Sequence, residues 1–384
     1  MKARVIIGAN YGDEGKGTVT ASYASKVKGK CLNVLTNGGS QRGHTVVTPF
    51  AEHVFKHFGS GTFFGADTYY SRFFILNPMQ FVVEYEELKS KCDIDKISIF
   101  RDSECRWSTP WDMMANQIQE ISRADKRHGS CGMGIWTTIS RIGNSSCFTI
   151  DNFIRLSLDE KINYLKSIRQ SYWPVTELKG FELYKDAWFS DTTIIRFIND
   201  VMFFYNRTKV VHINMLEGYN EVIFENGQGL ILSSDENNVH TTPSDTGGNY
   251  AAKIIVSMPN IESIDFHYVT RSYLTRHGNG DMEDESKMKS ISSDIQEDKT
   301  NHFNEWQGDF RYGKLDLPDL EARLNKDIKE CSFILPEFSL KDILKVNVEV
   351  THLDELDCLN DINKRFEKNH WNINSYDNPI VRLI

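Results

Sequence analysis

The chain has 384 residues, a length that one α/β domain with long insertions reaches as readily as two or three ordinary domains do. Apolar residues make up 40% of it, charged residues 25% and aromatic residues 12%, which excludes a disordered or fibrous protein. Lys and Arg number 44 against 53 for Asp and Glu, a net charge of −9, and no long basic run occurs. Nucleic acid is therefore not expected as a partner.

The longest apolar runs, such as residues 73–76, fall far short of the roughly 20 residues that span a bilayer. A strand pattern begins at Arg4, with no charged-then-apolar leader before it. We therefore expect a cytoplasmic protein without a membrane partner. The seven cysteines include no Cys-x-x-Cys pair, which predicts reduced thiols rather than disulfides or a structural zinc site.

Apolar segments with the composition of strands alternate with helical patterns along the chain. The predicted strands are residues 5–7, 32–35, 222–224, 266–269 and 346–350. The predicted helices are residues 81–91, 151–169, 191–206 and 317–329. This alternation predicts an α/β fold, with a large mostly parallel central sheet flanked by helices.

No repeat or linker divides the chain, so we expect a single domain over residues 1–384 with long functional loops at about 36–60, 125–145 and 277–314. The most polar stretch, residues 277–302, is interpreted as a loop rather than a domain boundary. Ligands of such sheets bind at the carboxyl ends of the strands, so the loops after the strands are where chemistry is expected.

The first strand runs into a glycine-rich loop, residues 8–18, which leads into a helix. Glycines let backbone N–H groups approach an anion, and Lys16 adds a positive charge, so the loop predicts a P-loop-like phosphate site. It is not a standard Walker A loop, because Asn10 and Gly17 stand where that motif needs Gly and Ser or Thr. Asp13 beside phosphates indicates a metal ion or a proton transfer. The alternative is a tight turn capped by acids.

Three further loops carry candidate groups. Residues 37–45 place His44 after a Gly-Gly turn, where an imidazole could reach a phosphoryl group or serve only the structure. Gln228, between two glycines, presents an amide that can donate and accept hydrogen bonds, or belongs to an ordinary turn. Asp354 follows the last predicted strand and could accept N–H groups from a purine edge, or be a surface carboxylate.

Together these loops resemble the adenylosuccinate synthetase family. Residues 12–17, Gly-Asp-Glu-Gly-Lys-Gly, reproduce the family's phosphate loop, and Gly38-Gly39 with Gly43-His44-Thr45 looks like its second loop. Further similarities follow in chain order at residues 60–61, 77–78, 129–135, 227–229, 241–248, 273–280, 313–316, 351–357 and 375. The resemblance implies the adenylosuccinate synthetase fold and a ligase that replaces a purine 6-oxo group with the amino group of L-aspartate.

The resemblance also implies roles for individual residues. Asp13 would take the purine N1 proton and bind Mg²⁺, His44 would act as an acid on the phosphate side, and Gln228 would hold the 6-phosphorylated base. One or two magnesium ions are implied, with Asp13 and the Gly43 carbonyl as ligands. Phosphates and the donor nucleotide would contact Lys16, Asn10, Gly12, Glu14, Gly15, Gly17, Thr18, Gly43, Thr45, His352, Asp354 and Ser375. The mononucleotide would contact Asn37, Ser40, Gln41, Ser130, Cys131, Arg141, Thr241 and Thr242, and L-aspartate would contact Arg311 and Gln307.

Departures from the family pattern bear on the substrate. Gln41-Arg42 replaces Asn-Ala, Ser130-Cys131 replaces Thr-Thr, and the aspartate loop keeps only Arg311 of its arginines. The chain most resembles the viral branch, which makes N6-succino-2-amino-2′-deoxyadenylate from dGMP on the route to 2-aminoadenine in phage DNA. If it is viral, we expect it in the host cytoplasm.

Several alternatives remain open. The enzyme could be an ordinary adenylosuccinate synthetase that uses IMP and GTP. A nucleotide hydrolase or a noncatalytic nucleotide sensor could use the same phosphate cradle. The viral branch favours ATP or dATP as phosphate donor, whereas Asp354 resembles the family's guanine-reading aspartate and favours GTP. A homodimer is implied by the resemblance alone.

Overall fold

A computed structural model describes residues 1–143, 148–234, 240–282, 284–287, 291, 303, 306–339, 344–352 and 356–376. Among them, nine strands form one sheet in which every neighbouring pair is parallel. Its order is β10 (Lys209–Val210), β8 (Ile99–Arg101), β6 (Asp67–Tyr70), β2 (Cys31–Leu35), β11 (Glu221–Gly229), β1 (Lys2–Gly8), β12 (Ser263–Arg271), β16 (Leu344–Thr351) and β17 (Asn372–Tyr376). The predicted α/β class and parallel sheet are confirmed.

The central strands are buried on both faces, which explains why they are almost continuously apolar. Val5, Ile6 and Ile7 of β1 are fully buried. Helices cover the sheet because parallel strands need crossover connections. These helices are α1 (Lys16–Ala24), α2 (Pro78–Lys89), α3 (Pro110–Arg123), α4 (Ile135–Ile142), α5 (Ile150–Arg155), α6 (Leu158–Ser171), α7 (Lys185–Phe189), α8 (Asp191–Arg207), α9 (Asn249–Ile255), α11 (Leu317–Ile334), α12 (Pro336–Ser339) and α13 (Leu356–Phe366).

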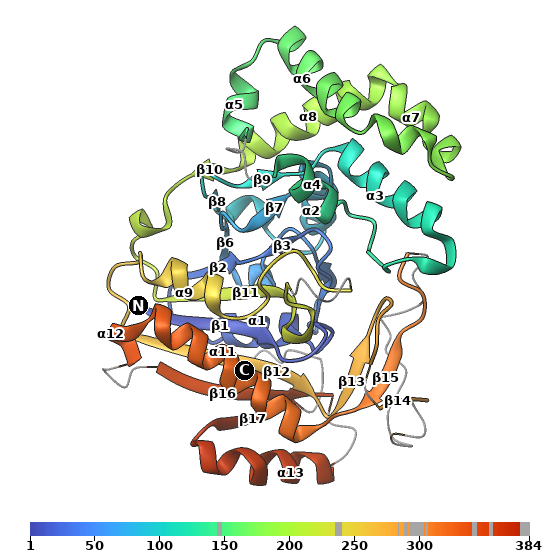
Figure 1. Cartoon of the computed structure of the whole chain (residues 1–384). Coiled ribbons are helices and arrows are strands. Elements are labelled where there is room, and N and C mark those ends of the chain that lie inside the picture. Colours follow the sequence, from blue (N-terminus) through green and yellow to red (C-terminus); the bar gives the residue numbers. More distant parts are fainter. Residues whose placement is uncertain are drawn as a thin grey trace.

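The helices gather at opposite ends of the molecule (Figure 1). Helices α5 to α8 lie together at one end, beyond β8 to β10, and their core includes Trp107, Trp111 and Trp188. Helices α11 and α13 lie toward the other end, near β16 and β17. The prediction of one helix over residues 151–169 is wrong. Ser157 caps the start of α6 through a capping box with Glu160, so the chain forms two helices there.

Three smaller sheets flank the main one. They are formed by β3 (Gly38–Gly39), β7 (Phe74–Leu76) and β9 (Arg106–Trp107); by the hairpin β4 (His44–Val47) and β5 (Glu52–Phe55); and by β13 (Tyr273–Arg276), β14 (Glu285–Ser286) and β15 (Arg311–Lys314). Among the described helices, none has the length and apolar character that a membrane crossing needs.

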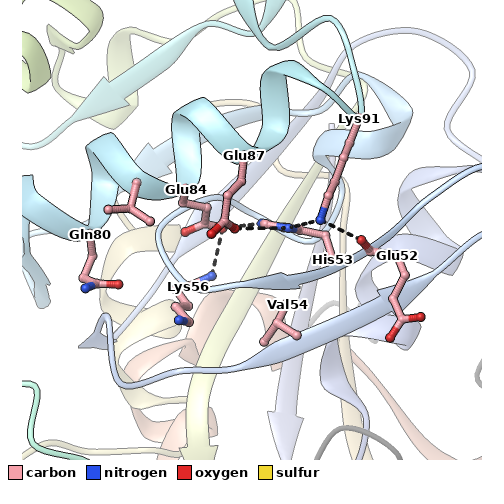
Figure 2. Close-up of a pocket in the computed structure, with 9 residues that line it drawn as sticks. Glu52, His53, Val54, Lys56, Gln80, Glu84, Glu87 and Lys91 are labelled. Carbon is pink, nitrogen blue, oxygen red and sulfur yellow. Dashed lines mark hydrogen bonds and ion pairs between the residues drawn. The ribbon is translucent and has the colours of Figure 1, made fainter.

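The hairpin that begins at His44 is anchored to α2 by a buried carboxylate, as Figure 2 shows. Glu84 lies 3.3 Å from the Nε2 atom of His53 and accepts a hydrogen bond of 2.9 Å from the backbone N–H of Lys56. Lys91 donates to the other ring nitrogen of His53 at 3.1 Å. These groups line a cavity of about 340 Å³ on this part of the surface. The second strand of the hairpin is therefore held against α2.

Candidate active site

The carboxyl ends of five consecutive strands, β2, β11, β1, β12 and β16, bring the candidate loops to one edge of the sheet. Strand β11 lies between β2 and β1. The irregular carboxyl end of β11, residues 226–229, contains Gln228 and is called the Gln228 turn. It is therefore placed between the glycine-rich loop after β1 and the loop of His44 after β2. Sequence alone does not give this order.

The glycine-rich loop folds around its own charged residues. The backbone N–H of Gly12 donates to Glu14 Oε1 at 2.7 Å, and Lys16 Nζ donates to the Gly12 carbonyl at 2.7 Å. Burial raises the pKa of Glu14 and lowers that of Lys16. Gly15 has a φ of 92°, a left-handed turn that favours glycine immediately before α1 begins. The loop thus holds a buried lysine at the start of a helix, which suits phosphate binding.

This loop touches the Gln228 turn directly. A Cβ atom at Gly12 would lie 2.7 Å from the Cα atom of Gln228, so only glycine fits. Gln228 itself has a φ of 62°, which is strained for a residue with a side chain. Its Oε1 atom is buried and has no hydrogen-bond partner among the described residues. A buried acceptor without a partner is costly unless a ligand or water meets it, so Gln228 is suited to bind a substrate.

His44 lies in a buried charged cluster. Its Nδ1 atom is 2.5 Å from Glu225 Oε1 and 2.6 Å from an Arg42 nitrogen, and the same Arg42 nitrogen is 2.6 Å from Glu225 Oε1. Burial alone would raise the pKa of Glu225, but Arg42 and His44 lower it below its ordinary value. Burial, followed by the charge of Arg42, lowers the pKa of His44 to about 3. The cluster therefore holds a carboxylate, a guanidinium and a neutral imidazole.

The start of α1 packs against His44. A Cβ atom at Gly17 would lie 2.9 Å from the Cβ atom of His44 and 2.9 Å from the Thr45 carbonyl oxygen. The phosphate loop therefore contacts the Gln228 turn through Gly12 and the His44 segment through Gly17. Groups able to bind a phosphoryl donor, a base and a transferring phosphoryl group are thereby brought together.

Asp13 lies on the open side of the loop. Its side chain is 26% exposed and its Oδ2 atom lies 3.5 Å from His277 Nδ1. Its backbone carbonyl accepts a hydrogen bond of 2.7 Å from Arg271. Among the described residues, no group of three His, Cys, Asp or Glu side chains could hold a metal ion by itself. Asp13 can offer a carboxylate oxygen to a magnesium ion that takes its other ligands from phosphates and water, which is how magnesium is commonly bound.

The end of β16 borders the phosphate loop on its other side. Thr351 Oγ1 donates a hydrogen bond to the Glu14 carbonyl at 2.5 Å. The His352 ring carbon Cε1 would lie 3.5 Å from a Cβ atom at Gly15. His352 is therefore beside the phosphate loop, where a donor nucleotide would continue. Asp354 lies outside the described residues, and Ser375 lies on the adjacent strand β17, where it is exposed.

Two asparagines that were predicted to contact nucleotides form hydrogen bonds within the chain. Asn10 donates to Thr270 at 3.0 Å and accepts from Arg323 at 2.8 Å. Asn37 accepts from the Gly227 backbone N–H at 2.8 Å and donates to the Asp245 carbonyl at 2.9 Å. Both side chains hold neighbouring loops in place.

Arg141 also forms an ion pair within the chain. Its guanidinium donates to both Asp112 oxygens, at 2.7 and 3.0 Å, and the Asp112 charge raises its pKa against the effect of burial. Ser130 exchanges hydrogen bonds with Asn116, and Cys131 is partly buried. These contacts hold the segment before α4 against α3.

Arg311, predicted to bind aspartate, forms an ion pair with Glu285 and donates to the Gly278 and Gly280 carbonyls at 3.0 and 2.9 Å. The Gln307 carbonyl accepts from the Gly278 N–H at 3.2 Å. Among the remaining predicted residues, Thr18 is buried in α1 and Thr45 is partly buried in β4. Between β3 and β4, Ser40 is buried, Gln41 is partly buried and Gly43 is exposed. Between β11 and α9, Thr241 is partly buried and Thr242 is buried.

Glu225, Arg42 and Arg271 contact the candidate site, but sequence reasoning gave them no role there. A signal existed for Glu225, which is a charged residue directly after the apolar run 222–224 and directly before the glycine turn. The sequence pattern marks Arg42 as a departure from the family but does not predict the burial of its side chain. Arg271 lies far along the chain from Asp13, so their contact depends on the fold.

The parallel sheet and the phosphate loop at its carboxyl edge define an α/β protein with a P-loop-like anion site. Residues 5–333 match the family model for adenylosuccinate synthetase, and the chain belongs to that family. It is 25% identical over 291 residues to the adenylosuccinate synthetase of Lactobacillus acidophilus, covering 73% of this chain and 64% of that protein. Its identity to the synthetase of Buchnera aphidicola is 25% over 287 residues, covering 72% and 63%. The match thus spans less than two thirds of these curated relatives.

Two solved structures share the fold. The fully ligated adenylosuccinate synthetase from Plasmodium falciparum matches with a TM-score of 0.65 and 20% identity, covering 94% of this chain and 78% of that one. The cyanophage S-2L succinoaminodeoxyadenylate synthetase, bound to dGMP and to dATP as an energy donor, matches with a TM-score of 0.63 and 14% identity. That match covers 99% of this chain and 93% of the phage protein. The predicted fold family is confirmed.

Proposed function

We propose that this chain is a carbon–nitrogen ligase that joins L-aspartate to C6 of a purine mononucleotide and consumes a nucleoside triphosphate. Family membership supports this activity. The observation that carries it is the packing of one phosphate loop against both the Gln228 turn and the His44 segment, through Gly12 and Gly17. That arrangement suits transfer of a phosphoryl group between two bound nucleotides.

In the first step, Asp13 accepts the N1 proton of the purine, which makes O6 nucleophilic. O6 then forms a bond to the γ-phosphorus, and the bond from that phosphorus to the β,γ-bridging oxygen breaks. Lys16 and the loop N–H groups stabilise the charge on the phosphates, and His44 contacts the group in transfer. Gln228 holds the base, because its buried Oε1 atom has no hydrogen-bond partner within the part of the chain that the structure describes.

In the second step, the amine of L-aspartate bonds to C6 and loses a proton. The C6–O6 bond breaks and phosphate leaves with O6. Magnesium, when bound, would neutralise phosphate charge, and the Asp13 carboxylate and the carbonyl of exposed Gly43 would hold it. Arg311 and Gln307 are proposed to lie near the aspartate, although the Arg311 guanidinium is paired with Glu285 here.

For the mononucleotide, we propose dGMP, which gives N6-succino-2-amino-dAMP. The changes at Gln41, Arg42 and Cys131 support a substrate other than the usual one. The similar length of the phage structure supports it too, since that match spans nearly all of both chains. Guanine offers the same O6 and N1–H to Gln228 and Asp13 as hypoxanthine does. For the phosphate donor we propose ATP or dATP. We also propose that the protein is a homodimer.

The test is a substrate matrix. IMP, GMP, dGMP and dIMP are each combined with ATP, dATP and GTP in the presence of L-aspartate and Mg²⁺, and the products are identified by mass spectrometry. We expect turnover of dGMP with an adenine donor, and its loss in Asp13→Asn. Turnover of IMP with GTP alone would contradict the proposed substrates but not the ligase activity. Release of phosphate without use of aspartate would contradict the ligase activity itself.

A further inference from the structure

The guanidinium of Arg42 has an unusual setting. Its side chain is fully buried, yet a single nitrogen, Nη2, makes the contacts with Glu225 and His44. The Nε and Nη1 atoms are buried without a hydrogen-bond partner among the described residues. A buried arginine that serves only packing normally has its donors satisfied, because each unpaired N–H is costly. Among the described residues, the guanidinium of Arg42 is therefore held through its Nη2 atom alone.

Arg42 Nη2, His44 Nδ1 and Glu225 Oε1 lie within hydrogen-bond distance of one another. Glu225 is fixed from its other side, because its Oε2 atom accepts a hydrogen bond of 3.0 Å from the Ser60 backbone N–H, and the Ser60 hydroxyl donates to Oε1. The His44 ring and Arg42 then approach the same Oε1 atom at 2.5 and 2.6 Å. Both contacts of the His44 ring, with Glu225 and with Arg42, use its Nδ1 atom. Its Nε2 atom is the ring nitrogen left for a ligand.

We propose that Arg42 is a positioning residue that, together with Glu225, fixes the orientation and tautomer of the His44 ring toward the phosphoryl group. The catalytic consequence rests on the function proposed above. A guanidinium is always charged and only donates hydrogen bonds, whereas a carboxylate only accepts them. Arg42 Nη2 therefore donates to Glu225 Oε1 and holds that oxygen as the acceptor of the His44 Nδ1–H. Without Arg42, Glu225 loses its ion pair, and the His44 ring is expected to adopt more than one orientation and tautomer.

Four variants test this inference. Arg42→Met keeps much of the side-chain length and removes its charge and donors, whereas Arg42→Lys keeps a positive charge. Arg42→Met/Glu225→Gln removes both buried charges, so it separates positioning from simple charge balance. Arg72→Met is the matched control, because Arg72 is a partly exposed surface residue whose ion pairs involve Asp102 and Glu104.

The first readout is turnover of the substrate combination that the wild-type protein uses. We expect Arg42→Met to lower kcat by at least about tenfold with little change in KM, because ring orientation matters in the transition state. Arg42→Lys is expected to recover part of the loss, and Arg72→Met to match the wild type. Full recovery in the double variant would show that Arg42 only balances the charge of Glu225, and would overturn the inference.

The second readout needs no activity. Long-range ¹H–¹⁵N NMR of histidine-labelled protein reports the tautomer of each ring, and His44→Gln identifies the His44 signals. We expect one defined tautomer in the wild type and a mixture in Arg42→Met. An unchanged His44 signal in folded Arg42→Met would overturn the inference. If the wild type shows no ligase activity but the signal still changes, the proposed function fails and the positioning by Arg42 stands.

Discussion

The Nδ1 atom of His44 lies 2.5 Å from Glu225 Oε1, and this contact joins the start of β4 to β11. The ring therefore has its orientation set by the main sheet as well as by its own loop. Three residues beyond Glu225, Gln228 turns back against the phosphate loop. One strand end thus organises both the imidazole and the amide that the proposed reaction needs.

Removal of the His44 imidazole should abolish most of the turnover without preventing nucleotide binding. We expect His44→Gln to lower kcat by about 10² to 10⁴, the usual contribution of a positioned acid or base. Calorimetric titration with the donor nucleotide should give an affinity within a few-fold of the wild type. His212→Gln, which changes an exposed histidine, is the control. Wild-type kcat in His44→Gln would exclude His44 from the chemistry.

Replacement of Lys16 should weaken binding of the triphosphate. Lys16 is buried and is held to the Gly12 carbonyl at the start of α1, so Lys16→Met removes the positive charge of the cradle. We expect KM for the donor to rise by about tenfold or more, since a charge-assisted contact to phosphate is lost. Lys28→Met alters an exposed lysine and should leave KM unchanged. Equal KM values in both variants would argue against the assigned phosphate loop.

Asp327 should make the protein less stable as the pH rises. Burial raises the pKa of Asp327 to about 7, although Tyr268 and the Gly248 N–H donate to it. The folded state therefore binds a proton that the unfolded state releases near pH 4, and the free energy of unfolding falls between about pH 4 and that raised pKa. Asp327→Asn should remove this slope in urea unfolding at several pH values. An identical pH dependence in both proteins would contradict the assignment.

The capping box that separates α5 from α6 should contribute to stability but not to activity. The Ser157 hydroxyl accepts a hydrogen bond from the Glu160 N–H, and Glu160 accepts from the Ser157 N–H. Ser157→Ala should lower the free energy of unfolding by about 1 kcal/mol. Ser167→Ala, within the same helix, should cost less, and kcat should stay at the wild-type value in both. A loss of activity in Ser157→Ala would show that this end of the molecule influences the site.

The strands and their loops were predictable because buried parallel strands are short apolar runs that end at glycine or polar residues. Their order in the sheet was not, since the placement of β11 between β1 and β2 depends on packing across the whole chain. The helix pattern over residues 151–169 concealed a break, because the apolar spacing continues past the cap at Ser157.

The side chains of the site were less predictable than its loops. The sequence showed that Arg42 departs from the family pattern but not that it is buried against Glu225. The contact of Arg141 with the mononucleotide stays a prediction, but its pairing with Asp112, which precedes it by 29 residues, was not predicted. Ion pairs of this kind form between elements that only the fold brings together, so local patterns do not reveal them.

The most direct test of the central claim follows the oxygen atom at C6 of the purine. The mononucleotide that turns over is labelled with ¹⁸O at that position, and the released phosphate is analysed by mass spectrometry. Transfer of the γ-phosphoryl group to O6 predicts that the ¹⁸O label appears in phosphate in proportion to product formed. Unlabelled phosphate, with the ¹⁸O lost to water, would contradict phosphorylation of the purine oxygen and with it the roles assigned to Asp13 and His44.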